Sequence, residues 1–571
     1  MALLDWLVLL ATTFAIIGYG LWRTRGGGST TAEYLHGGYV ENWRTIGLSV
    51  MATQASAITF LSVPGQGFED GMRFVQFYFG LPLAMVVISI WFIPIYYRLR
   101  VLTAYEYLET RFDLKTRLLA ATLFLIQRGL ATGVTIYAPA IILSAILGWP
   151  LQPTIIGLGL FITFYTVVGG ARAVSQTQKQ QMIVMLGGIV VAAIVIVLRL
   201  PKDVTFANAV AIAGVHGRMN PVNFGFALND RYNVWSGLTG GFFLALSYFG
   251  TDQSQVGRYL NGKSITESRL GLLFNGALKI PMQALILFIG VLVFVFYQFT
   301  PAPILFNQPL AEQVAHSPEG PAWSRLQARW RDVQAQKQAH VQAYLSADHA
   351  GDAQGQARAK AAMRLVETDA LDLRKEAKDL AKRAVPGAET KDTDYIFISF
   401  VTHWLPSGLI GLLLAVILAA AMSSTASELN ALGSTTTVDF YRRILRPQAT
   451  DAETLRASRL STIVWGIVAV GFASFASLLD NLIQAVNILG SIFYGTVLGI
   501  FLVAFGLKRI SGSGVFWPAV ISQVGVIALF FASDIGFLWY NVIGCMGVIV
   551  LALLVHTFRR ANGPAHLSGG S

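Results

Sequence analysis

The chain has 571 residues, of which 54% are hydrophobic and only 13% are charged, and its mean hydropathy is +0.56. A soluble protein carries about twice that share of charge, so the composition excludes a soluble globular protein and predicts an all-α, polytopic membrane protein. The net charge of +11 does not indicate a nucleic-acid partner, because the basic residues gather at one set of predicted span ends. A single cysteine, Cys545, excludes an internal disulfide framework and cysteine-based metal sites.

Apolar runs of about 20 residues predict membrane-spanning helices. Thirteen are expected, near residues 3–22, 42–66, 73–97, 116–147, 151–168, 178–199, 232–255, 269–298, 397–436, 455–477, 481–506, 513–533 and 535–557. The first run ends in Arg23 and Arg25 without a small-residue cleavage site. It is therefore expected to be a retained span and not a cleaved signal peptide.

Basic residues follow every second predicted span, whereas the short loops at 148–150, 478–480 and 534 contain none. The positive-inside rule then places the N-terminus outside and the C-terminus in the cytoplasm. An odd number of spans agrees with ends on opposite sides. The expected location is the cell (inner) membrane, with the lipid bilayer as the protein's surroundings.

Two predicted spans are interrupted by polar residues. The sequence ATQASAIT occupies 52–59, and LSYFGTDQSQ occupies 246–255 around Gly250. Such interruptions indicate discontinuous helices, whose freed backbone groups bind ions and polar substrates at mid-membrane. The interruptions lie five spans apart, which is the spacing of two inverted five-helix repeats; two ordinary kinked spans are the alternative.

A polar segment at 301–395 separates the eighth and ninth predicted spans. It is rich in Ala, Gln and charged residues, and it predicts two helices joined near Gly351, Asp352 and Gly355. Its charges alternate in sign, which indicates a solvated surface. We expect a helical hairpin outside the membrane, either a tolerated insertion or a surface for a partner.

The span at 397–436 becomes polar on one face. Ala420, Ser423, Ser424, Ser427 and Glu428 follow helical spacing and share that face. Against lipid these groups would be unfavourable, so they are expected to face protein or a water-filled cavity. Neighbouring hydroxyls suit a small hard cation; close helix packing by Ser and Ala is the alternative.

Several motifs follow one another in the order seen in a known family. They include ATQASAITF (52–60), TAYEYLETRF (103–112), YTVVGGARAV (165–174), FGTDQSQVGRYL (249–260) and AAAMSSTASELNA (419–431). The chain resembles the sodium/solute symporter family, which includes bacterial sugar, proline and sialic acid symporters. The resemblance implies a LeuT-type 5+5 inverted repeat with one extra N-terminal helix.

The resulting organisation has six parts. They are an extra helix and cytoplasmic link (1–41), the first repeat with an outer loop (42–230), core helices six and seven (231–300), the extracytoplasmic insertion (301–395), core helices eight to ten (396–510) and two C-terminal helices with a short tail (511–571).

The family resemblance also implies a sodium site. Its ligands would be the backbone carbonyls of Ala52, Ala55 and Ala420 and the hydroxyls of Ser423 and Ser424. Neutral oxygens of this kind dehydrate sodium without trapping it.

Family members often carry an Asp on the sixth span that is implicated in a second sodium or in coupling. Here Gln178 stands at that position, beside Lys179, so a second sodium is not expected there. We hypothesise that Lys179 lies near Glu428 and that these groups act in coupling; the alternative is that Lys179 reaches the cytoplasmic surface.

The resemblance is less specific about the solute. Lys279 and Gln484 match positions that contact hydroxyls in sugar-carrying members, and a mid-membrane Lys is a functional candidate by itself. Further candidates for solute contact are Thr53, Gln54, Thr59, Tyr78, Tyr248 and Asn487. The motif TAYEYLETRF is closer to the monocarboxylate and iodide branch, and Lys279 with Arg128 is compatible with an organic anion.

The sequence thus predicts a sodium-coupled secondary active symporter that imports a small polar solute, a sugar or an organic anion, by alternating access. Sodium is the only cofactor expected. No nucleophile–base motif, phosphate loop or metal-ligand cluster is present, so an enzyme is not expected. A proton-coupled transporter of the same fold and a passive channel remain alternatives.

Overall fold

The computed structural model describes residues 2–24, 34, 41–388, 390, 392–475 and 482–561. Arg25, most of the predicted link before residue 42, the loop at 478–480 and the C-terminal tail lie outside these residues. The described residues are almost entirely helical and form no strand beyond one isolated bridge between Glu41 and Gly262. The predicted all-α class is confirmed.

The first half of the chain contains the N-terminal helix and the first repeat. Its elements are α1 (Leu3–Thr24), α3 (Trp43–Gln54), α4 (Ala57–Asp70), η1 (Gly71–Tyr78), α5 (Leu81–Val87), η2 (Ile88–Phe92), α6 (Ile93–Leu99), α7 (Glu106–Arg111), α8 (Leu114–Leu147), α9 (Leu151–Arg199) and α10 (Phe206–Val215).

The second half contains the second repeat, the hairpin and the C-terminal helices. Its elements are η3 (Ser236–Gly240), α11 (Gly241–Thr251), α12 (Gln253–Tyr259), α13 (Ile265–Phe299), α14 (Gln308–Ala315), α15 (Gly320–His349), α16 (Ala353–Ala384), α17 (Thr393–Trp404), α18 (Leu409–Thr435), η4 (Thr436–Leu445), α19 (Asp451–Ala473), α20 (Leu482–Gly506), α21 (Gly512–Ala532) and α22 (Leu538–Ala561).

Within the described residues, 11 helices are long and apolar enough to cross a membrane. The polytopic architecture is therefore confirmed, while the count of thirteen spans and the six-part division stay predictions. The two interrupted spans account for part of the difference, because a broken helix supplies shorter continuous segments.

One predicted boundary is confirmed and another is wrong. The runs at 151–168 and 178–199 form two separate spans, Leu151–Ala171 and Val174–Arg199, which are joined within α9 by a kink at Gly170, where φ is 58°. The run at 397–436 is divided, because Pro406 and Gly408, with φ of 90°, end α17 before α18 begins. A positive φ favours glycine at both bends.

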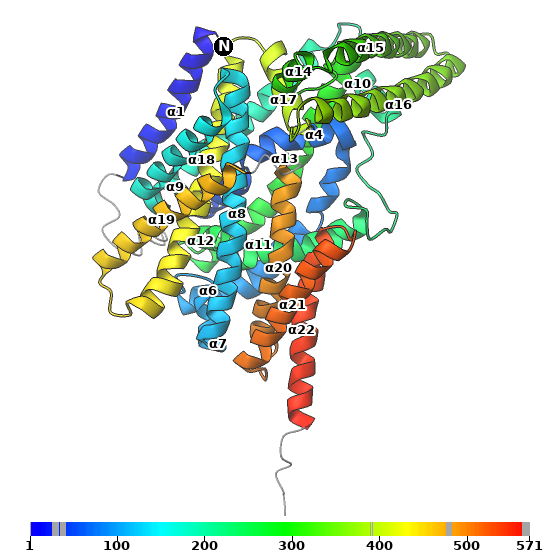
Figure 1. Ribbon diagram of the computed structural model, residues 1–571. Coiled ribbons are helices and arrows are strands. Elements are labelled where there is room, and N and C mark those ends of the chain that lie inside the picture. The colour runs from blue at the N-terminus through cyan, green and yellow to red at the C-terminus, as the bar shows by residue number, and fades with distance from the viewer. Residues whose placement is uncertain are drawn as a thin grey trace, which may run out of the picture.

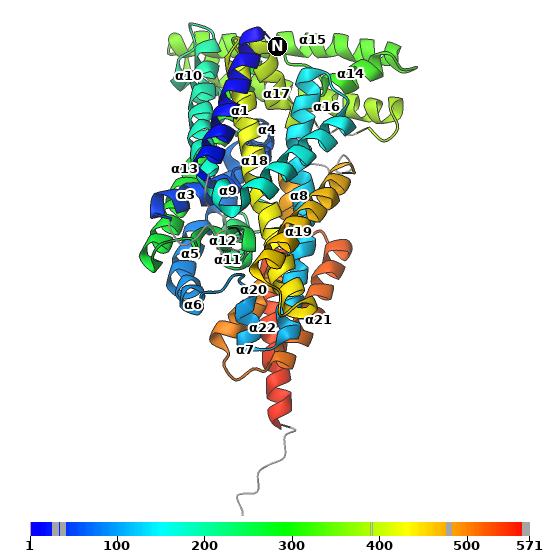
Figure 2. The ribbon, with the colours of Figure 1, turned by 90° about the vertical axis from the view of Figure 1, so that its left-hand side faces the viewer.

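The long helices run side by side, and the hairpin α15–α16 lies across one end of them (Figure 1). The N-terminus lies at the same end as the hairpin, whereas α22 extends from the opposite end (Figure 2). This arrangement agrees with the expectation that the N-terminus and the hairpin share one side of the membrane.

The hairpin has the two helices that the sequence predicts. Gly351, with φ of 65°, makes the turn, and the Asp352 carboxylate caps α16 by accepting from the backbone N–H groups of Gln354 and Gly355. Trp323 and Trp330 are buried in a small core of the hairpin's own. The segment is thus a folded unit and not an irregular loop.

Both predicted interruptions are present. The first separates α3 from α4 at Ala55 and Ser56, and the second lies at Asp252, two residues after the predicted Gly250. The interrupted helices meet, because α12 packs on α3 and both pack on α18. The polar helix α18 therefore lies beside both breaks.

Candidate functional site

The polar face of α18 is turned into the protein. Ala420, Ser423, Ser424, Ser427 and Glu428 are all at most 4% exposed. The prediction that this face avoids lipid is confirmed, and each hydroxyl has a hydrogen-bond partner as burial requires.

The predicted sodium ligands lie at the contact between α18 and the first break. The Ser423 hydroxyl donates to the carbonyl oxygen of Ala52 at 2.8 Å, and the Ser424 hydroxyl donates to that of Ala420 at 3.0 Å. Ala55 ends α3 with a ψ of 71°, outside the helical range. Four of the five predicted oxygens thus already pair across or along this contact, and all belong to neutral groups, so the donor set fits sodium.

We call the five predicted sodium ligands, the oxygens of Ala52, Ala55, Ala420, Ser423 and Ser424, the cage. Gln178 of α9 lies beside it. Its amide nitrogen donates to the carbonyl of Ser423 at 3.1 Å and to the hydroxyls of Thr53 and Ser427 at 3.1 and 2.6 Å. Three oxygens therefore converge on one N–H₂ group. An uncharged donor stands where these oxygens would otherwise be free to coordinate a cation.

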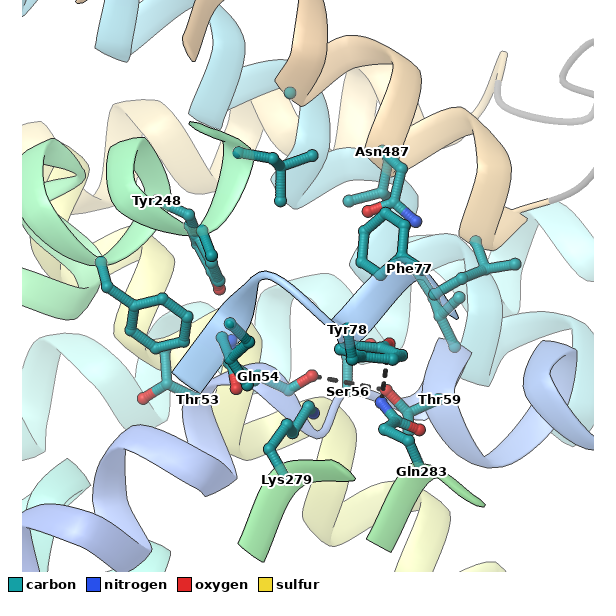
Figure 3. A pocket seen from close by; sticks show the side chains of 18 of the residues that line it. Thr53, Gln54, Ser56, Thr59, Phe77, Tyr78, Tyr248, Lys279, Gln283 and Asn487 are labelled. Carbon is teal, nitrogen blue, oxygen red and sulfur yellow. Dashed lines mark hydrogen bonds between the residues drawn. The ribbon is translucent and has the colours of Figure 1, made fainter. Parts of the chain in front are cut away.

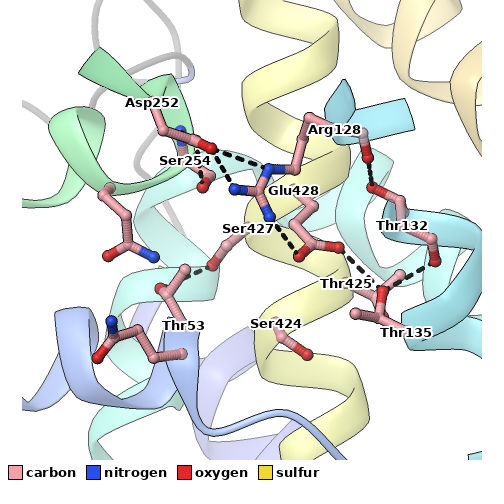
Figure 4. A network of polar contacts seen from close by, with 12 residues as sticks. Thr53, Arg128, Thr132, Thr135, Asp252, Ser254, Ser424, Thr425, Ser427 and Glu428 are labelled. Carbon is pink, nitrogen blue, oxygen red and sulfur yellow. Dashed lines mark hydrogen bonds and ion pairs between the residues drawn. The ribbon is translucent and has the colours of Figure 1, made fainter. Parts of the chain in front are cut away.

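A buried ionic network lies next to the cage (Figure 4). Arg128 of α8 donates to the Glu428 carboxylate at 3.0 Å and, through Nε, to the Asp252 carboxylate at 3.1 Å. Thr135 donates to the second oxygen of Glu428 at 2.9 Å, and Tyr494 donates to Asp252 at 2.9 Å. One guanidinium thus joins the second break, α18 and α20 through two carboxylates.

The hypothesis that Lys179 pairs with Glu428 is wrong in this structure. Glu428 is paired with Arg128, and the Lys179 side chain is exposed. Gln178, the next residue along α9, points inward instead. Adjacent residues of a helix face directions about 100° apart, so the two cannot both reach the cage.

A cavity of about 110 Å³ opens beside the first break (Figure 3). Seven of the eight predicted solute contacts line it: Thr53, Gln54, Thr59, Tyr78, Tyr248, Lys279 and Asn487. They come from six different elements, α3, α4, η1, α11, α13 and α20. The cavity also shares Arg128 and Glu428 with the ionic network.

Lys279 of α13 is the cation of this cavity that has no acid beside it. It is 2% exposed, and its ammonium lies 5.9 Å from the centre of the Tyr78 ring. Within the described part of the chain no carboxylate forms an ion pair with it. A buried ammonium of this kind is unfavourable unless an anion or an aromatic face compensates it.

One predicted contact is misplaced. Gln484 does not line the cavity, and its side-chain oxygen accepts from Arg231 at 2.7 Å. Sequence reasoning also missed Gln283, which lines the cavity and donates to the Tyr78 hydroxyl at 2.9 Å. Gln283 lies four residues after Lys279, so their shared helix face was the signal that could have identified it.

The sequence profile of the Sodium:solute symporter family matches residues 34–317 and 363–522. The chain belongs to this family. The match leaves out 318–362, which covers all of α15, the hairpin turn and the first residues of α16. The family is one of transporters.

Named relatives agree with this family membership. The human sodium/iodide cotransporter is 34% identical over 295 residues, 51% of this chain and 44% of its own length. Human sodium-coupled monocarboxylate transporter 1 is 34% identical over 250 residues, 44% of this chain and 40% of its own. A putative sodium-dependent multivitamin transporter of Drosophila melanogaster is 25% identical over 526 residues, which is 91% of this chain and 73% of its own length. The chain spans less than half of the first two relatives.

A solved structure of a substrate-bound, outward-open Na⁺-coupled sialic acid symporter has a TM-score of 0.76. The match covers 98% of each chain at 22% sequence identity, so it establishes the fold. The present chain therefore has the LeuT-type architecture that the family resemblance implies.

The ionic network yields a prediction about stability. Arg128→Gln leaves two buried carboxylates without their cation, which costs about 3–5 kcal/mol. The thermal midpoint of the purified protein, followed by tryptophan fluorescence, should fall by several degrees. Lys115→Gln, which removes an exposed cation from the same helix, should leave the midpoint unchanged. Equal midpoints for the two variants would contradict the structural role of Arg128.

Proposed function

We propose that the protein is a sodium-coupled symporter that imports a small organic anion, such as a monocarboxylate, by alternating access. The cage of neutral oxygens holds sodium, and the cavity beside it holds the solute. Both sites use the last turn of α3, just before the break, because Ala52 belongs to the cage and Thr53 and Gln54 line the cavity. One conformational change can therefore open or close both sites.

The charge balance of the cavity carries the proposal of an anion. With all four groups ionised, Arg128 and Lys279 carry two positive charges and Asp252 and Glu428 carry two negative charges, so the four have no net charge, although both carboxylates pair with Arg128. Sodium in the adjacent cage adds one positive charge. Because Coulomb interactions are strong in a poorly solvated site, a monovalent anion is then favoured, and by linkage the anion favours sodium to the same extent.

Three observations weigh against the alternatives. Gln484, one of the two residues that supported a sugar, lies outside the cavity. The cage contains carbonyl and hydroxyl oxygens and no titratable group, which supports sodium over a proton as the coupling ion. The named relatives are described as sodium/iodide and sodium-coupled monocarboxylate transporters, and that description favours a coupled carrier over a passive channel.

The hairpin and the N-terminus face the outside in this proposal, and α22 ends in the cytoplasm. Basic residues at alternate span ends support that orientation. Sodium then enters from outside, down its gradient, and draws the anion inward across the cell membrane.

Uptake measurements test the proposed function directly. Proteoliposomes with an inward sodium gradient should accumulate a radiolabelled monocarboxylate, whereas a potassium gradient should not drive accumulation. Lys279→Gln should lower kcat/KM for that anion roughly tenfold to a hundredfold, because a charged hydrogen-bond partner is lost. The exposed Lys263→Gln variant is the control. Sodium-independent downhill flux in the wild type would contradict coupled transport.

The sodium cage is tested by its two serines. Ser423→Ala and Ser424→Ala should each raise the sodium concentration needed for half-maximal uptake several-fold, because one oxygen ligand is lost at about 1–2 kcal/mol. Ser434→Ala removes a hydroxyl of the same helix that donates to the Asn430 carbonyl of its own helix and should have no such effect. Unchanged sodium dependence in both cage variants would refute the assignment.

Gln178 implies that a single sodium is coupled to each solute. Its amide donates to three oxygens, so Gln178→Asp should free them and supply a charge for a second cation. The number of sodium ions per solute, measured from reversal potentials in proteoliposomes, should rise by about one. Gln178→Asn keeps the amide and should keep the wild-type ratio. An unchanged ratio in a transporting Asp variant would disprove this role.

A further inference from the structure

A second cavity lies outside the membrane core, between the hairpin and the outer ends of α4 and α13. It has a volume of about 410 Å³. Phe68, Phe294, Tyr297 and Phe306 form an aromatic cluster in its wall, with neighbouring ring centres 5.5–6.3 Å apart. We call this cavity the vestibule. Part of its wall belongs to α15, which the family profile leaves unmatched.

Ion pairs fix the walls of the vestibule. Lys337 of α15 lies 2.7 Å from the carboxylate of Glu367 on α16. Arg374 and Lys378 of α16 each lie 2.9 Å from the carboxylate of Asp392, which also accepts from the backbone of Phe306. The hairpin is therefore held against the core by buried charges, and the cavity is a built feature of the fold.

These ion pairs leave a positive charge. The lining has five cationic side chains, Arg218, Lys337, Arg374, Lys375 and Lys378, and three carboxylates, Glu69, Asp70 and Glu367. Asp392, which pairs with Arg374 and Lys378, adds a fourth carboxylate. Burial by itself raises the pKa of Glu367. Lys337 and His216 lower this pKa by more than burial raises it, so the pKa lies below its usual value and Glu367 is ionised at neutral pH. One positive charge remains uncompensated.

Several buried donors in the vestibule have no partner. The amide nitrogen of Gln334 and the Nε atoms of Arg218 and Arg374 form no hydrogen bond among the described residues, although all three atoms are buried. Gln334 is 4% exposed, and its oxygen already accepts from the backbone N–H of Ala302. A buried unpaired donor is unfavourable by about 1–3 kcal/mol, so these groups are arranged for an acceptor that the protein does not supply.

The geometry points to a binding site in the vestibule for a small monovalent organic anion with an aromatic or other apolar body. Its carboxylate accepts from Gln334 and the two arginines, and its apolar part packs on the aromatic cluster, whose ring edges carry partial positive charge. The remaining positive charge matches one carboxylate and not a dianion. The site is distinct from the transport cavity and does not depend on which solute is carried.

Benzoate is the probe, because it combines one carboxylate with an aromatic ring. Equilibrium dialysis of radiolabelled benzoate against the purified full-length protein, in sodium-free potassium buffer, should give one site per chain. Benzamide, which is uncharged and similar in shape, should compete at least tenfold more weakly. Absence of benzoate binding at millimolar concentration, or equal competition by benzamide, would overturn the proposal.

Gln334→Glu removes the free amide donor, places a carboxylate in the vestibule and keeps the oxygen that bonds Ala302. It should lower benzoate affinity at least tenfold. Gln336→Glu makes the same change at an exposed position of the same helix and should leave affinity unchanged. Equal losses in both variants would show a general effect of charge and would refute the site.

A second pair of variants tests the site even if Gln334→Glu, at a buried position, fails to fold. Lys375 lies exposed at the vestibule, so Lys375→Glu should weaken benzoate several-fold without disturbing a buried contact. Lys382→Glu, on the same helix and outside the lining, should have no effect. Unchanged affinity in the Lys375 variant, together with unchanged affinity in a folded Gln334 variant, would reject the vestibule as the binding site. Failed transport with intact sodium-free binding would count against the proposed function alone.

Discussion

The need to satisfy broken backbone inside a membrane governs this structure. A helix can stop at mid-membrane only if neighbouring protein groups replace the lost hydrogen bonds, because lipid offers none. At the first break the hydroxyl of Ser423 donates to the freed carbonyl of Ala52. The small residues of α18 allow that close contact. The hydrogen bonds that stabilise the break therefore also bring polar oxygens together at a site buried from water.

The second break meets the requirement with charge. The Asp252 carboxylate accepts from the backbone N–H of Ser254 at the start of α12 and pairs with Arg128 as well. Glu428 completes the group from α18. Ions buried together are stable only while every partner is in place. Helices α8, α12, α18 and α20 are thus constrained to move in a coordinated way, which is what coupling between sites requires.

Local patterns foretold much of this fold and less of its site. The runs of small and hydroxyl residues predicted both breaks and the buried face of α18, because helical spacing alone decides which residues share a face. The apolar runs also separated the two spans on either side of Gly170, but Gly408 lies inside one predicted run, and its break required knowledge of φ that such a run does not contain.

Long-range pairing was not accessible in the same way. Arg128 and Glu428 are 300 residues apart, and no local pattern reports that they meet. Lys179 was one hypothesis for the partner because it is a cation next to an expected coupling residue, but helix rotation turns it outward, as the alternative had it. Gln484 was placed by its match to a family position, and its pairing with Arg231 depends on the path of the loop before η3, which helical spacing does not predict.

Helix α4 connects the two cavities physically. Its first residues follow the break that forms the sodium cage, and its last residues, Phe68 to Asp70, form part of the vestibule wall. At 1.5 Å per residue its 14 residues span about 21 Å. Because a short packed helix moves as a rigid body, a tilt at the cage also shifts the wall of the vestibule. The Thr393 hydroxyl, which donates to Glu69 at 2.6 Å, ties that outer end to α17. If the proposed outer site and the proposed sodium cage are both occupied, this shared element links them, and each ligand would then bias the other by the same free energy.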